Sequence, residues 1–137
     1  MIKADAYGHG LLEVARSLEG ICDFFGVARI EEARALREGG IGGNILVCSD
    51  IVEDAVSYAA GNCITLTVSS AKELEVCAAR AKGKGRPLSV HIKVDSGMNR
   101  LGVRSLKEFS SIIKKLKKSP YVIPEGVYTH FADCSDL

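Results

Sequence analysis

The feature that most constrains the fold is a regular alternation of short apolar segments with longer segments of helical periodicity. The apolar segments are rich in β-branched and aromatic residues, which is typical of strands. The predicted strands are residues 1–3, 24–28, 44–48, 63–68, 88–94 and 126–130. The predicted helices are residues 11–18, 30–37, 51–60, 71–81 and 105–117. Six strands and five helices in strict alternation predict an α/β fold with a parallel sheet.

Alternation alone fits two architectures, a doubly wound sheet and part of a (β/α)₈ barrel. The strands are nearly continuous apolar runs, as expected for parallel strands buried on both faces. No Gly-x-Gly-x-x-Gly motif follows the first strand, so a dinucleotide-binding fold is not supported. A complete barrel takes about 250 residues, whereas here the sixth strand ends at residue 130 and no helix follows it. We therefore expect residues 1–137 to form one incomplete domain of a larger protein.

Two helix starts carry a recognisable capping pattern. Ser70 precedes the fourth predicted helix with Glu73 three residues later, and Ser105 precedes the fifth with Glu108 at the same offset. A serine hydroxyl and a glutamate carboxylate at this spacing can satisfy the free N–H groups of the first helical turn.

Composition excludes several classes of protein. Apolar residues make up 47% and charged residues 26%, and the formal net charge is +1, so nothing favours binding to nucleic acid or to an anionic membrane. No signal peptide precedes the first motif, and no apolar run approaches the roughly 20 residues of a membrane span.

Five cysteines without a Cys-x-x-Cys pair argue against a disulfide framework or a metal site, and indicate the cytoplasm. Apolar neighbours predict a place in the core for Cys22, Cys48, Cys63 and Cys77.

Candidate functional groups follow the strand ends, where parallel α/β folds collect their active-site residues. Lys3 ends the first predicted strand, and Tyr7 lies in the glycine-flanked turn after it. A desolvated lysine has a lowered pKa, and its free amine can form a Schiff base with a carbonyl compound. The alternative is an exposed lysine whose ammonium group reaches water.

The end of the fifth predicted strand and the end of the sixth offer further candidates. Lys93 interrupts an apolar strand, and Arg100 follows seven residues later, past a glycine turn. Two cations on one loop suit an anionic ligand such as a phosphate or a carboxylate, although an internal salt bridge with Asp95 explains them equally well. His130 ends the last predicted strand and fits either a functional site or the core.

Three segments resemble those of alanine racemases. The segment KADAYGHG, residues 3–10, resembles the pyridoxal-phosphate attachment signature of that family at every position. The segment HIKVDSGMNRLG, residues 91–102, is similar to the family's Lys-Val-Asp-(Thr/Ser)-Gly-Met-x-Arg-Leu-Gly block. The segment YTHFA, residues 128–132, is similar to its Thr-His-Phe-Ala block. Three blocks in the correct order are far more specific than any one of them.

The resemblance implies the incomplete N-terminal (β/α)₈ TIM-type barrel of a homodimeric enzyme that binds pyridoxal phosphate. It further implies interconversion of L- and D-alanine by proton transfer at Cα, which supplies D-alanine for cell-wall synthesis. A C-terminal β-rich domain belongs to such enzymes and lies outside this sequence. Two alternatives within the same fold are a racemase for serine or another amino acid and a non-enzymatic pyridoxal-phosphate-binding protein.

The resemblance also implies roles for five residues. Lys3 would hold the cofactor covalently and serve as one of two acid/base groups, and Tyr7 would contact the cofactor phosphate. Arg100 would bind the cofactor's phenolic oxygen and lie near the substrate carboxylate, while Lys93 would be carboxylated and would orient Arg100. His130 would belong to the network beside the cofactor ring. The second base and the partner of the pyridine nitrogen lie outside this sequence, so we expect the chain alone to be inactive.

Overall fold

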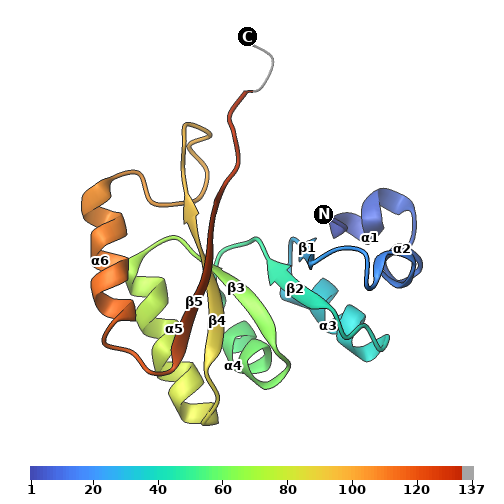
Figure 1. Cartoon of the computed structure of the whole chain (residues 1–137), viewed down its shortest axis with the longest axis horizontal. Helices are drawn as coiled ribbons and strands as arrows, with labels where there is room; N and C mark the ends of the chain where they lie inside the picture. Colours follow the sequence, from blue (N-terminus) through green and yellow to red (C-terminus); the bar gives the residue numbers. More distant parts are fainter. Residues whose placement is uncertain (134–137) are drawn as a thin grey trace.

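The chain folds around one parallel sheet, seen in a computed structural model that describes residues 1–133 (Figure 1). Its strands are β1 (Phe24–Val27), β2 (Asn44–Val47), β3 (Ile64–Val68), β4 (Leu88–Val94) and β5 (Val122–Thr129). Each strand pairs in parallel with the next one in the sequence, so the order across the sheet is β1-β2-β3-β4-β5.

Six helices accompany the strands among the described residues. They are α1 (Lys3–Gly8), α2 (Leu11–Leu18), α3 (Ile30–Glu38), α4 (Glu53–Gly61), α5 (Ala71–Lys84) and α6 (Leu106–Leu116). The five predicted helices are confirmed with small changes at their ends. The capping pattern is confirmed as well, because the N–H groups of Glu73 and Glu108 donate to the hydroxyls of Ser70 and Ser105, both at 3.2 Å.

The predicted first strand, residues 1–3, is wrong. Ile2 donates one backbone hydrogen bond to the carbonyl oxygen of Gly26 at 2.8 Å, but no ladder follows. From Lys3 the chain turns instead into α1, a helix that no sequence pattern predicted. One paired residue is too few for a strand. The described sheet therefore has five strands rather than six, and there are six helices rather than five.

Strand order decides between the two architectures. Every crossover moves one strand along in the same direction, and right-handed crossovers of this kind place all the helices on one face of the sheet. Helix contacts agree, because α4 packs against α5 and α5 against α6 in a single layer (Figure 1). A doubly wound sheet would carry helices on both faces. The predicted partial barrel is therefore confirmed.

The two faces of the sheet differ in chemistry. Side chains alternate along a strand, and the face toward the helices carries buried apolar residues such as Ile45, Val90 and Ile92, each no more than 1% exposed. The opposite face, which forms the barrel interior, carries polar residues including Lys93 and Tyr128. No helix within residues 1–133 is long and apolar enough to cross a bilayer.

The predicted burial of four cysteines holds only in part. Cys77 is fully buried in α5, and Cys48 is half-buried after β2. Cys22 and Cys63 are exposed, because they lie in the turns that lead into β1 and β3 rather than in the strands themselves. Cys134 lies outside the described residues.

Candidate active site

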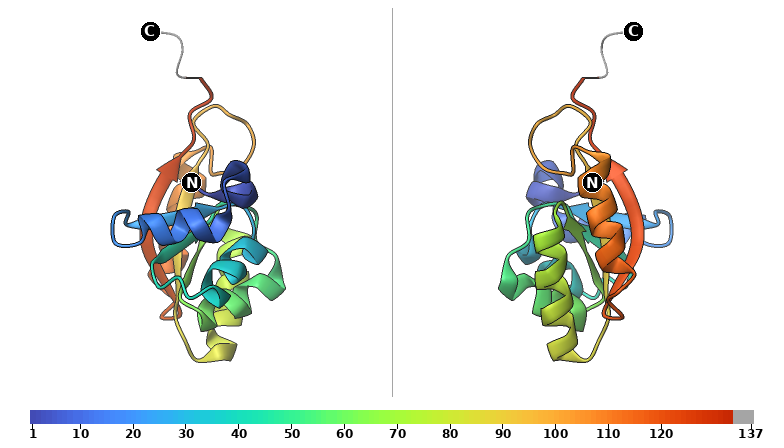
Figure 2. Two further views of the ribbon diagram at one scale, coloured as in Figure 1. Left: turned by 90° about the vertical axis from the view of Figure 1, so that its right-hand side faces the viewer. Right: turned by 90° about the vertical axis from the view of Figure 1, so that its left-hand side faces the viewer.

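All five predicted site residues line a single cleft at the carboxyl ends of the strands. The cleft has a volume of about 380 Å³, and its walls include Lys3, Tyr7, Lys93, Arg100 and His130. In both views of Figure 2, α1 lies at the same end of the sheet as the loop that follows β4. The fold therefore brings the three sequence blocks together: the second and third follow β4 and β5, and α1 carries the first, which was predicted to follow a strand.

Lys3 and Tyr7 are presented by a left-handed helical turn. The four residues from Ala4 to Tyr7 have φ between +52° and +56°, the left-handed region that L-residues rarely adopt. Such a conformation costs roughly 1–2 kcal/mol per residue. Lys3 is half-buried at the start of this turn, so it is neither a strand residue nor a freely exposed lysine.

Side-chain carboxylates hold the turn in place. Glu32 of α3 accepts hydrogen bonds from the N–H groups of Ala4 at 2.7 Å and of Ala28 at 2.7 Å, and so joins α1 to the end of β1. Asp5 accepts from the N–H of Leu11 at 2.7 Å and so joins the turn to α2. These bonds explain how a strained segment persists at a site where side-chain direction matters.

Lys93 is buried on the face of β4 that points into the barrel, with 3% of its surface exposed. Its Nζ donates to the carbonyl oxygen of Leu101 at 3.0 Å and lies 5.7 Å from the centre of the Tyr128 ring. The ion pairs found among residues 1–133 do not include Lys93. A buried cation without a carboxylate partner is unusual and is typical of functional sites.

The loop between residues 95 and 102 is closed by backbone contacts. Val103 donates to the carbonyl oxygen of Lys93 and accepts from the N–H of Asp95, both at 2.9 Å. Gly102 makes this closure possible, since its φ is +129° and a Cβ there would lie 2.5 Å from the backbone nitrogen of Asp95. The loop presents the exposed Arg100 at the rim of the cleft.

Asp95 does not form the salt bridge that sequence offered as an alternative role for Lys93 and Arg100. Its carboxylate pairs instead with Nε of Arg104 at 3.0 Å and accepts from the N–H groups of Gly97 and Asn99. Burial alone would raise the pKa of Asp95, but these hydrogen bonds and the Arg104 charge together lower it. Asp95 therefore does not neutralise the charge of Lys93 or Arg100.

His130 is exposed at the rim and is therefore not a core histidine. Two residues before it, Tyr128 also lines the cleft, although the sequence analysis did not select it. Burial raises the pKa of the Tyr128 phenol well above its ordinary value. The alternation of side chains along β5 is the signal that would have found Tyr128, since residues two apart share a face. Cys48 and Asp50, which follow β2, also line the cleft; neither was among the predicted site residues, and Cys48 was predicted to lie in the core.

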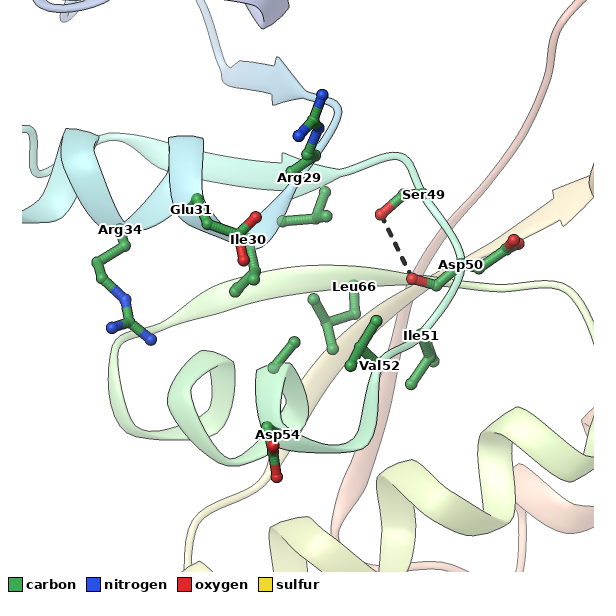
Figure 3. A pocket seen from close by; sticks show the side chains of 12 residues that line it. Arg29, Ile30, Glu31, Arg34, Ser49, Asp50, Ile51, Val52, Asp54 and Leu66 are labelled. Carbon is green, nitrogen blue, oxygen red and sulfur yellow. Dashed lines mark hydrogen bonds between the residues drawn. The ribbon is translucent and has the colours of Figure 1, made fainter.

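A second hollow of about 360 Å³ lies between α3 and α4 and shares Ser49 and Asp50 with the cleft (Figure 3). Its lining combines Arg29 and Arg34 with the three carboxylates of Glu31, Asp50 and Asp54, so negative charge is in excess there. In contrast, the cleft gathers Lys3, Lys93 and Arg100 around the one carboxylate of Asp50. Of these two hollows, the cleft is the one with the excess of positive charge that favours an anionic ligand.

The residues of the cleft fit pyridoxal phosphate. That cofactor carries an aldehyde, a phosphate and a phenolic oxygen, which require an amine and several cationic or neutral hydrogen-bond donors. Lys3 offers the amine, while Arg100, Tyr7 and His130 offer donors along the walls of the same cleft. The arrangement suits covalent capture of a carbonyl compound beside bound anionic groups.

Comparison with known proteins agrees with this chemistry. The chain is 43% identical over 136 residues to the alanine racemase of Streptococcus agalactiae, covering 99% of this chain and 37% of that protein. It is 42% identical over 137 residues to alanine racemase 1 of Oceanobacillus iheyensis, covering 99% of this chain and 36% of that protein. The chain thus spans little more than a third of the length of these relatives.

Solved structures give the same result. An alanine racemase of Clostridium difficile in complex with cycloserine superposes with a TM-score of 0.91 and 41% identity, covering 96% of this chain and 36% of that one. A histidine racemase of Leuconostoc mesenteroides superposes with a TM-score of 0.90 and 32% identity, again covering 96% and 36%. The family model described as the alanine racemase N-terminal domain matches residues 1–137. The chain therefore belongs to the alanine racemase N-terminal domain family.

Proposed function

We propose that the full-length protein is a pyridoxal-phosphate-dependent racemase that interconverts L- and D-alanine, and that this chain forms the cofactor-binding part of its barrel. One observation carries the proposal: Lys3, Tyr7, Lys93, Arg100 and His130 line one cleft with an excess of positive charge. Family membership supports the same activity.

The cofactor, when bound, withdraws electrons from the substrate and makes its Cα proton acidic. Lys3 would supply the amine that holds the cofactor and, once displaced by the substrate amine, would remove or return the proton at Cα. Tyr7 would donate a hydrogen bond from its hydroxyl group to the phosphate. The rigid turn that carries both residues would fix their side chains relative to each other, which proton transfer requires.

Arg100 would bind the phenolic oxygen of the cofactor and steer the substrate carboxylate. Lys93 lies under the same loop, through its hydrogen bond to the carbonyl oxygen of Leu101. Two cations close together in a site of low dielectric constant repel each other. Carboxylation would make Lys93 an anion, and a charge-assisted hydrogen bond would then orient Arg100.

Alanine is the first substrate to test, and the histidine racemase among the structural neighbours supports testing other amino acids as well. We further propose that the full-length protein is a cytoplasmic homodimer in which the partner subunit supplies the second base. Its product would be D-alanine for cell-wall synthesis.

The test uses the full-length protein loaded with pyridoxal phosphate. Borohydride reduction followed by peptide mapping should place the cofactor on Lys3, and chiral chromatography should show racemisation of L-alanine in preference to L-serine and L-histidine. Lys3→Ala should abolish turnover, whereas Lys107→Ala, on the exposed side of α6, should not. Cofactor binding without racemisation of any amino acid would favour the non-enzymatic alternative, and a label on Lys93 would contradict the assignment of Lys3.

A further inference from the structure

Tyr128 occupies a special position across β4. It pairs in register with Lys93, and its ring lies near two side chains of that strand, those of Lys93 and His91. The ring centre is 5.7 Å from Nζ of Lys93 and 6.3 Å from the centre of the His91 ring. His91, with Glu125 at 3.5 Å, belongs to a polar cluster deeper in the barrel interior. The phenol ring therefore lies near both Lys93 and His91 and is part of the wall of the cleft.

The hydroxyl of Tyr128 is fixed by a chain of hydrogen bonds that crosses the sheet. Tyr128 Oη lies 2.8 Å from Oγ1 of Thr67 on β3, and that hydroxyl donates to the carbonyl oxygen of Val47 on β2 at 2.7 Å. Threonine has one hydroxyl proton. Because it goes to Val47, the Tyr128 hydroxyl must be the donor to Thr67. Thr67 is 1% exposed, so water does not compete for these bonds.

The reactivity of the Cys48 thiol can serve as a probe of the contact between Tyr128 and Thr67. The thiol is half-buried just after β2, lines the cleft together with Tyr128, and donates a weak hydrogen bond to the carbonyl oxygen of Leu46 at 3.9 Å. Any movement of the ring away from Thr67 would therefore change the access of reagents to this thiol.

We propose that Tyr128 is a positioning residue for the reaction, held by Thr67 so that its ring closes the space beneath Lys93 and directs that side chain toward the loop that carries Arg100. This inference rests on the proposed racemase activity. Its physical basis is preorganisation, because a side chain that orients a catalytic group must itself be locked by packing and hydrogen bonds. The hydroxyl proton is committed to Thr67, so Tyr128 itself does not transfer protons.

The test compares Tyr128→Phe, Thr67→Val and the double variant in the full-length protein with bound pyridoxal phosphate. Tyr128→Phe should lower kcat for L-alanine roughly fivefold with little change in KM, because one buried hydrogen bond is lost and the ring is no longer locked. Thr67→Val should lower kcat further, since it leaves the buried Tyr128 hydroxyl without an acceptor. The double variant should then be more active than Thr67→Val alone, the sign expected when two residues act as one unit.

Tyr121→Phe is the matched control, because it removes the same atom from a partly buried tyrosine outside the cleft; its kcat should equal that of the wild type. A second measurement does not depend on activity. In cofactor-free protein, iodoacetamide should alkylate Cys48 roughly fivefold faster in Tyr128→Phe and Thr67→Val than in the wild type, as peptide mapping would show.

The possible results separate the two proposals. Lower thermal stability of Tyr128→Phe with an unchanged kcat per bound cofactor would make the residue merely structural and overturn the inference. Independent, additive effects of the two substitutions would overturn its coupling to Thr67. Absence of racemisation in the wild type would instead refute the proposed function, and faster alkylation of Cys48 in the variants would still establish the lock between Tyr128 and Thr67.

Discussion

At the scale of single residues, the carboxylate of Asp95 connects the cleft to stability. Its side chain is 1% exposed and is bonded to Arg104 and to two backbone N–H groups of its own loop. These contacts favour the ionised form and outweigh the opposite effect of burial, so the pKa of Asp95 is lower in the folded protein than in the unfolded chain. The stability of the loop that presents Arg100 therefore depends on the ionisation of Asp95.

The depressed pKa predicts how stability depends on pH. Ionised Asp95 stabilises the fold above the pKa of the unfolded chain, about 4, and this contribution is lost as the pH falls through the lower pKa of the folded protein. Asp95→Asn should therefore lower the free energy of unfolding at neutral pH, and the difference from the wild type should shrink in acid. Urea denaturation at several pH values measures this. The exposed Asp23 gives the control, Asp23→Asn, and an Asp95→Asn deficit that does not vary with pH would contradict the prediction.

Two residues of the cleft could be predicted from the sequence because they stand out from their surroundings. Lys93 interrupts an apolar strand and Lys3 begins a motif, so both were visible before the structure. Alternation along β5 could have placed Tyr128 on the same face as His130, but its contact with Thr67, 61 positions away in the chain, could not be predicted. Pairing between distant strands is set by register, and register cannot be read from one strand alone.

At the scale of elements, α1 is the part of the fold that sequence predicted worst. Residues 1–3 resemble a strand, yet the chain forms a left-handed turn immediately afterwards, at Ala4. Neither helical nor strand periodicity signals such a turn, since only glycine prefers it and this turn is built from alanine, aspartate and tyrosine. The right-handed helices were predicted well because local signals determine them, namely an apolar stripe and, in α5 and α6, a serine cap.

The left-handed turn predicts an unusual response to glycine. Ala4 has φ of +52°, so Ala4→Gly relieves roughly 1–2 kcal/mol of strain and adds about 0.5–1 kcal/mol of unfolded-state entropy. The substitution should leave the full-length protein unchanged or up to about 1 kcal/mol more stable. Ala55→Gly, in the right-handed α4, should instead destabilise it by about 1 kcal/mol. Chemical denaturation of both variants measures the contrast, and equal destabilisation would show that the turn stores no strain.

At the scale of the whole molecule, the alternation of strands and helices predicted a parallel sheet but not its winding. A barrel and a doubly wound sheet differ in whether successive connections between strands all run in the same direction across the sheet. No residue of a connection indicates that direction. The polar face of β4 and β5 was a further clue. Lys93 and Tyr128 point away from the helices, and a polar inner face suits a barrel whose interior ends in a binding site.

The edges of the sheet predict how the isolated chain behaves in solution. Among the described residues no strand pairs beyond β5, and Ile123 and Val127 of that strand are 47% and 57% exposed. An unpaired apolar edge is a template for association with further copies. A polypeptide of residues 1–137 should therefore self-associate, and Val127→Lys should reduce this by placing a charge on the edge. Val52→Lys is the matched control, since Val52 is 64% exposed but precedes α4, away from the edge. Light scattering after size-exclusion chromatography gives the molar mass, and so the extent of self-association, of the wild-type chain and of the two variants. A monomeric wild-type chain with sharp cooperative unfolding would show that five strands suffice for a closed, stable fold.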